Sequence, residues 1–298
     1  MNRILLSAAT LVVGCIGSLA ANAAPVFTNL NSASVDAMVN SLLSGGSGIT
    51  INSATYTGAN TGSGLFSNGN SSNIGINQGI VLSSGHLDMM HIEFSDNNGS
   101  AGNPLLEKYN GGRVTSNAST LSIEFTPTGN QITFSYVFAS REYPNYVNEV
   151  YNDAFAFLVN GENRALIPGT QTAVSINTVN CGDELGQDPS HCNLFRDNRN
   201  GSLSDLDLGG FTQVFNVVAN VTPGAINTLV LAIADTADEV LDSAVFLSGG
   251  SLSVCGGPGQ PPCQQPDPAE VAEPGTVGLA GLALLAIGGL RRSRRKQR

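Results

Sequence analysis

The chain has 298 residues, of which 41% are hydrophobic and only 12% are charged. The hydrophobic fraction excludes an intrinsically disordered chain, because it supplies enough apolar surface to bury a core. The formal net charge of −10 excludes nucleic acid as a partner, since nucleic-acid binding needs clusters of Lys and Arg.

The first 23 residues have the pattern of a secretory signal peptide. Arg3 precedes an apolar stretch over residues 4–20, and an Ala-x-Ala sequence ends at Ala23. This order predicts export and cleavage after Ala23. Two alternatives stay open. One is an N-terminal anchor helix, for which the apolar stretch is short, and the other is lipidation of Cys15, which lies in a sequence similar to a lipoprotein box.

Residues 34–44 predict one amphipathic helix, which we expect to cover a sheet. Its apolar residues recur at the spacing of a single helical face; they are Val35, Met38, Val39, Leu42 and Leu43. Ser32 or Ser34 can cap the start of this helix, and two glycines end it.

Most of the remaining chain predicts strands. A stretch rich in Gly, Ser, Asn and Thr comes first, over residues 52–73, and contains no clean repeat. The predicted strands then cover residues 121–125, 132–138, 154–159, 173–179, 211–221, 229–234 and 245–254. Short strands separated by turn signals, without helical periods between them, indicate an all-β fold, an antiparallel β-sandwich that we expect to be jelly-roll-like. They exclude a parallel α/β fold.

Four cysteines remain after removal of the signal peptide, and their spacing predicts two local disulfides. Cys181 and Cys192 flank a polar loop, whereas Cys255 and Cys263 flank a segment rich in Pro and Gly. An even number of cysteines in an exported chain favours disulfides. Pairing between nearest neighbours is the simplest arrangement, although the sequence leaves the connectivity open.

The C-terminal region predicts a linker over residues 255–272 and a sorting tail over residues 273–298. In the tail, Glu273, Pro274 and Gly275 precede a short apolar segment, and six of the last eight residues are Lys or Arg. This layout resembles a PEP-CTERM signal, with Ala272 in place of the first Pro of the usual motif. The resemblance implies processing by an exosortase-type enzyme while the tail lies in the inner membrane. An ordinary tail anchor is the alternative.

Four motifs of the body resemble the choice-of-anchor L domain. They are GINQGIVLSSG at 75–85, FASREYPNY at 138–146, NDAFAFLVNG at 152–161 and LDSAVFL at 241–247. Arg141 and Ala156 depart from the pattern, in which an acidic residue and Gly are common at these positions. The resemblance implies an exported all-β module over residues 24–254, without established catalytic residues.

Acidic residues are the remaining candidates for chemistry, since the sequence lacks nucleophile-elbow, zinc-protease and phosphate-loop motifs. Asp153, Asp238 and Asp242 are the first candidates for calcium, which takes six to eight oxygen ligands. Solvated acidic turns are the alternative. A glycosidase would instead need a pair of carboxylates such as Glu142 and Asp242, and the absence of Trp disfavours a sugar-stacking cleft.

These features predict an exported, non-catalytic surface or biofilm-matrix protein with no certain cofactor. Residues 24–274 hold 6 Lys or Arg and 23 Asp or Glu, a net charge of 6 − 23 = −17, so this body should repel itself unless cations screen or bridge it. The expected partners are an exosortase-type enzyme and exopolysaccharide or other surface proteins. The alternatives are a calcium-dependent adhesin and a secreted hydrolase acting on polysaccharide.

Overall fold

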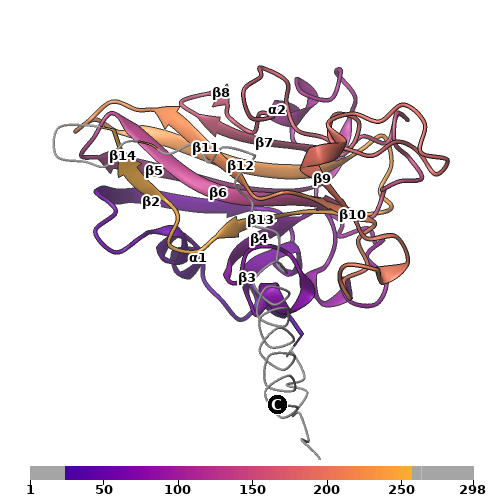
Figure 1. Cartoon of the computed structure of the whole chain (residues 1–298). Coiled ribbons are helices and arrows are strands. Elements are labelled where there is room, and N and C mark those ends of the chain that lie inside the picture. The colour runs from indigo at the N-terminus through magenta and orange to yellow at the C-terminus, as the bar shows by residue number, and fades with distance from the viewer. Residues whose placement is uncertain (1–23, 257–262, 264–298) are drawn as a thin grey trace, which may run out of the picture.

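The computed structural model describes residues 24–256 and residue 263. The predicted signal peptide, most of the linker and the sorting tail lie outside these residues. The described part forms two antiparallel sheets stacked face to face, with few helices (Figure 1). The prediction of an antiparallel β-sandwich is therefore confirmed. Among the described residues, no helix is long and apolar enough to cross a membrane.

The larger sheet has nine strands, with β6 at its centre. Its strands in spatial order are β1 (Val26–Asn29), β3 (Ser63–Ser67), β4 (Gly79–Ser83), β13 (Ser243–Ser248), β6 (Gln131–Ser140), β10 (Gly210–Thr212) and β9 (Phe195–Asp197). Two more strands, β11 (Phe215–Asn220) and β14 (Ser253–Cys255), also pair with β6.

The smaller sheet has five strands and the longer ladders. In spatial order these are β2 (Ile49–Thr57), β5 (Thr115–Pro127), β12 (Asn227–Thr236), β7 (Ala154–Val159) and β8 (Glu162–Asn163). The pairing of β12 with β5 contains a register shift, because Ile233 lies opposite Ser119 whereas Asp235 lies opposite Ser116. The extra residue belongs to β5, so the bulge lies in β5 and β12 keeps its alternation.

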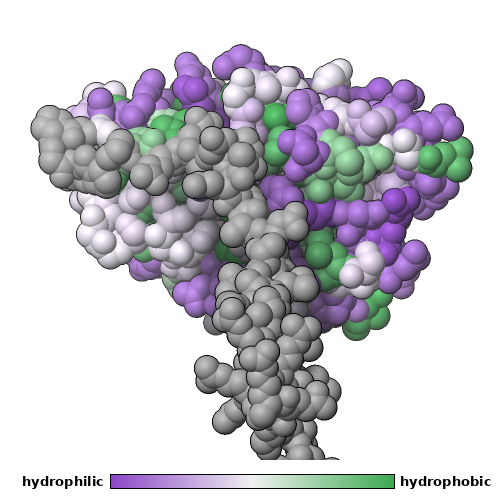
Figure 2. Space-filling view, viewed as in Figure 1, coloured by the Kyte–Doolittle hydropathy of each residue, from purple (hydrophilic) through white to green (hydrophobic). Residues whose placement is uncertain are grey.

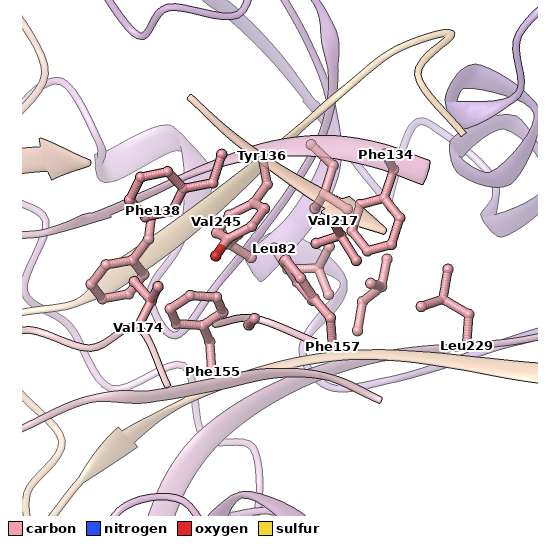
Figure 3. Close-up of a cluster of buried hydrophobic side chains, with 14 of the residues drawn as sticks. Leu82, Phe134, Tyr136, Phe138, Phe155, Phe157, Val174, Val217, Leu229 and Val245 are labelled. Atoms are coloured by element: carbon pink, nitrogen blue, oxygen red, sulfur yellow. The ribbon is translucent and has the colours of Figure 1, made fainter. Parts of the chain in front are cut away.

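The core lies between the two sheets and is rich in aromatic rings. Alternate residues of β6 point inward, so that Tyr136 meets Phe157 edge to face at 4.8 Å and Phe138 stacks on Phe155 at 4.7 Å (Figure 3). These four side chains are at most 1% exposed. Each such burial contributes roughly 1.5–3 kcal/mol to folding, and the edge-to-face geometry adds directional contacts that hold the sheets in register.

One helix, α1 (Val35–Leu42), covers the sandwich as predicted. Ser34 caps it, since its hydroxyl accepts a hydrogen bond from the amide of Ala37 at 3.1 Å. Met38, Val39 and Leu42 are buried and belong to the main core, and the helix contacts β2, β3 and β4. A second helix, α2 (Pro104–Glu107), was not predicted and is a single turn long.

The stretch over residues 52–73 is more ordered than its composition suggested. It contains most of β2 and all of β3, and β1 and β4 were also missed. Strand β2 lies at the edge of its sheet and many of its side chains are exposed, so its small polar residues do not conflict with strand geometry.

Two of the predicted strands are divided in the structure, and a third is absent. Residues 211–221 divide into β10 and β11, and residues 245–254 divide into β13 and β14 around a turn. Residues 173–179 form no strand, although Val174 and Ile176 are buried in the main core. The Thr178 hydroxyl accepts from the amide of Ser175 at 2.8 Å, and such local bonds compete with sheet pairing.

Both cysteine pairs are joined as nearest neighbours. Cys181 is bonded to Cys192, and Cys255 at the end of β14 is bonded to Cys263. The second bond ties the segment after the last strand back to the edge of the larger sheet.

Candidate functional site

Four acidic residues meet at one end of the sandwich and form what we call the carboxylate cluster: Glu142, Asp153, Asp235 and Asp242. Glu142 follows β6 and Asp242 precedes β13, both in the larger sheet. Asp153 precedes β7 and Asp235 lies near the end of β12, both in the smaller sheet. The strand ends that carry them lie toward β9 and β10 in Figure 1.

Antiparallel register explains why residues so distant in the sequence meet here. In the larger sheet, Ser140 at the end of β6 lies opposite Ser243 at the start of β13. In the smaller sheet, Ala234 of β12 lies opposite Ala154, the first residue of β7. Each pairing brings one strand end beside one strand start, and stacking of the two sheets then brings the four acids together.

The cluster is closed off from solvent. Glu142 is 1% exposed, and the other three acids are 0% exposed. Asp153 links the sheets, because its carboxylate accepts hydrogen bonds from the hydroxyl of Ser243 at 2.6 Å and from the amide of Thr236 at 3.0 Å. Asp153 is therefore anchored by donors from both sheets.

The other three acids are only partly satisfied. Asp235 Oδ2 accepts from the side-chain amide of Asn117 at 2.8 Å, and Asp242 Oδ2 accepts from the backbone amide of Asp96 at 3.0 Å. Asp235 Oδ1, Asp242 Oδ1 and Glu142 Oε2 are buried and have no hydrogen-bond donor. Buried polar atoms without a partner are rare and costly, and they commonly mark a functional requirement.

Burial and mutual repulsion favour the protonated form of the cluster. Desolvation, followed by the charges of Asp238 and Asp235, raises the pKa of Glu142 to about 10. Desolvation and the charge of Asp235 raise the pKa of Asp242 to about 9. Desolvation raises the pKa of Asp235 to about 7, although the nearby Ser84 hydroxyl and the Asn117 side-chain amide oppose this shift. The pKa of Asp153 is also well above its ordinary value, chiefly through desolvation.

No basic side chain of the described residues forms an ion pair with the cluster. Arg141 directly precedes Glu142, but its Nε contacts Asp207 Oδ2 at 2.9 Å instead. The same Asp207 oxygen also accepts from the amide of Phe94 at 2.8 Å. The negative charge of the cluster is consequently left to protons or to a bound cation.

Two of the three predicted calcium candidates belong to the cluster, and one does not. Asp153 and Asp242 lie inside it, whereas Asp238 is partly exposed and lines a surface pocket of about 750 Å³ together with Glu239. Asp235, not chosen from the sequence, occupies the interior position instead. Strand alternation is the sequence signal that could have indicated Asp235. Leu231 and Ile233 of the same strand face the core, and Asp235 lies two residues further on, so it points to the same side.

The described residues contain no ready-made group of three or more His, Cys, Asp or Glu side chains in metal-binding geometry. The four carboxylates influence one another's charge, but they do not converge on a single point as they stand. Binding of an ion would thus require rotation of some of these side chains.

A separate surface pocket of about 830 Å³ is lined in part by Arg141. Polar groups dominate its lining, which includes Arg199, Asp207 and Tyr143. None of the four cluster acids lines this pocket. It is open to solvent and is the larger of the hollows described here.

The fold and the cluster together define a class of protein: an antiparallel β-sandwich domain with disulfide-linked loops and a buried acidic centre at one end. The sequence profile of the Choice-of-anchor L domain matches residues 26–253, and the chain belongs to this family. The family is one of surface-associated proteins, in agreement with the predicted export. No curated protein and no solved structure matches the chain significantly.

Proposed function

We propose that this protein is an exported, non-catalytic module of the bacterial surface or the extracellular biofilm matrix. The observation that carries the proposal is the closure of the carboxylate cluster. A surface module that binds or scaffolds needs a stable body, whereas a hydrolase needs acids that its substrate can reach.

The non-catalytic part of the proposal follows from the position of the candidate hydrolytic pair. Glu142 and Asp242 have the raised pKa values that an acid catalyst requires. Both are at most 1% exposed, so a glycosidic bond would not reach them without opening of the sandwich. A glycosidase places its two carboxylates on either side of a substrate cleft.

A polysaccharide assay tests this part. We expect no release of reducing ends when the protein is incubated with acidic or neutral exopolysaccharides. Release that is lost in both Glu142→Gln and Asp242→Asn, while the variants remain folded by circular dichroism, would establish the hydrolase instead.

Export and sorting are supported by features at both ends of the chain and by the disulfides. The signal peptide ending at Ala23 directs the chain out of the cytoplasm. Disulfides form and persist in the oxidising environment outside the cytoplasm. At the other end, Glu273, Pro274 and Gly275 are recognised by an exosortase-type enzyme while the Arg-rich end stays on the cytoplasmic side. The protein passes through an inner-membrane intermediate before it reaches the surface.

Exopolysaccharide and other surface proteins are the proposed partners in the matrix. Hydrophilic residues cover much of the face seen in Figure 2, and hydrophobic residues are scattered on it. Arg141 and Arg199 in the polar pocket are hydrogen-bond donors. The hydroxyl and carboxylate oxygens of saccharides accept hydrogen bonds from such donors.

The sorting step can be tested in the native cell with Glu273→Ala. We expect an unprocessed form to accumulate in the inner membrane, because the recognition motif has lost its carboxylate. The matched control is Glu270→Ala, which removes the same charge three residues upstream and should be processed normally. Intact-mass analysis reads out both termini, and normal release of Glu273→Ala would contradict recognition at this motif.

A further inference from the structure

We propose that the carboxylate cluster binds one calcium ion between the two sheets. Three observations carry the inference: four acidic side chains are buried at the same end of the sandwich, three of their oxygens have no donor, and no basic side chain of the described residues forms an ion pair with them. The inference is independent of the sorting tail and of the partner in the matrix.

The unpartnered oxygens are the first step of the argument. Glu142 Oε2, Asp235 Oδ1 and Asp242 Oδ1 come from three different chain segments and are all buried. A hydrogen-bonded structural network would satisfy these atoms, as Ser243 and Thr236 satisfy Asp153. Oxygens left free inside a cluster of like charge are suited to a cation.

The chemistry of the cluster selects a hard cation. All its side-chain donors are carboxylate oxygens, and neither His nor Cys belongs to it, so a soft transition metal is disfavoured. Calcium accepts six to eight oxygens in irregular geometry, including backbone carbonyls and water. Magnesium requires near-ideal octahedral geometry and loses water reluctantly, which fits poorly with ligands from four separate strand ends.

The carboxylates of the cluster must move closer together to coordinate an ion, and the unpartnered oxygens indicate which side chains can rotate. Asp153 is held by two hydrogen bonds and provides a fixed point. Rotation of Asp235 and Asp242 exchanges their hydrogen bonds from Asn117 and from the Asp96 amide for contacts with the ion, whereas Glu142 Oε2 has no hydrogen bond to lose. The loop between Asp235 and Asp242 also carries Asp238 and Glu239, which line a surface pocket, and the charge of Asp238 acts on Glu142.

The test measures calcium binding to the full-length chain after removal of metal ions by a chelator. Isothermal titration at pH 8 should give one calcium ion per chain, with a Kd of about 10⁻³ M or tighter, the weak limit of extracellular calcium modules. The melting temperature should rise with calcium, since a ligand that binds only the folded state stabilises it. Magnesium at equal ionic strength should give a clearly smaller rise.

Three variants locate the site. Asp235→Asn and Asp242→Asn each replace a ligand with a neutral group of the same shape, and each should weaken calcium binding at least about tenfold. The matched control, Glu149→Gln, removes one charge from an exposed position in the loop that follows Glu142 and should bind calcium normally. Because the amide variants remove buried charge, we expect them to fold.

Two results would overturn the proposal. One is the absence of binding heat and of any shift in melting temperature up to about 10 mM calcium in the folded protein. The other is an equal rise with magnesium, or an undiminished rise in Asp235→Asn and Asp242→Asn, because either result would indicate screening of the surface acids. Failure of the calcium site would leave the sorting experiment with Glu273→Ala unaffected.

Discussion

Single residues of the same type have opposite properties in this protein because their neighbours differ. Asp197 lies near the surface. Burial raises its pKa, but the hydrogen bonds from Arg199 and the charge of Arg199 together outweigh burial, so that the pKa lies below its ordinary value. Asp235 has no such partner, and desolvation raises its pKa to about 7. The difference between these two aspartates lies in their surroundings and not in their chemistry.

The raised pKa values predict that the metal-free protein loses stability as the pH rises. Glu142, Asp235 and Asp242 bind protons more tightly in the folded than in the unfolded chain, so their favourable contribution is complete below about pH 4 and is lost as the pH rises through about 7 to 10. The other charged or titratable groups near them are Asp96, Asp153, Asp238, Glu239 and Tyr143.

Denaturant unfolding in chelator at pH 5, 7 and 9 measures this effect. We expect the free energy of unfolding to fall by at least about 3 kcal/mol between pH 5 and 9, since titration of Asp235, whose pKa is about 7, contributes on the order of that amount alone. Asp242→Asn should show a shallower slope, whereas Glu149→Gln should keep the original one. A slope that is flat or rises with pH would show that the cluster is not protonated in the folded protein.

At the scale of elements, the strands form the two sheets, and helix α1 covers part of the core between them. The helix has a capped start at Ser34 and a buried face that includes Met38. Eight residues are too few for a stable isolated helix. Its stability must therefore come from packing against β2, β3 and β4.

Met38→Ala tests this dependence on packing. The substitution should lower the free energy of unfolding by about 2–4 kcal/mol, because it leaves a cavity beneath the helix. Asn40→Ala, on the exposed face of the same helix, should change stability by less than about 0.5 kcal/mol. Equal effects of the two substitutions in urea unfolding would show that the helix does not rely on its buried face.

At the scale of the whole molecule, the disulfides and the acidity suit a protein outside the cell. The bond between Cys181 and Cys192 closes a loop with a sequence separation of 11, in a region where no regular strand holds the chain. Long irregular loops of this kind depend on such links for their order.

The double variant Cys181→Ser/Cys192→Ser should lower the free energy of unfolding by about 2–3 kcal/mol, mainly because the unfolded chain gains freedom. Thermal unfolding of the oxidised protein provides the comparison, and Gln187→Ala in the same loop is the control. An unchanged melting temperature in the double variant would mean that the loop is held by its other contacts.

Local sequence determined much of the architecture. Alternation in 121–125 and 132–138 predicted β5 and β6, and the spacing of Met38 and Leu42 predicted α1. These signals are readable because the period of a strand or a helix is a property of neighbouring residues. The nearest-neighbour disulfides are equally local.

Only the tertiary structure decided which acids meet. Asp153 and Ser243 are 90 positions apart and share a hydrogen bond, and their contact depends on strand register and on the stacking of two sheets. The sequence indicated Asp238, but the inward alternation of β12 continues to Asp235, which the stacking of the two sheets buries. Burial and pKa depend on the summed surroundings of a side chain, and those surroundings exist only once the long-range pairings have formed.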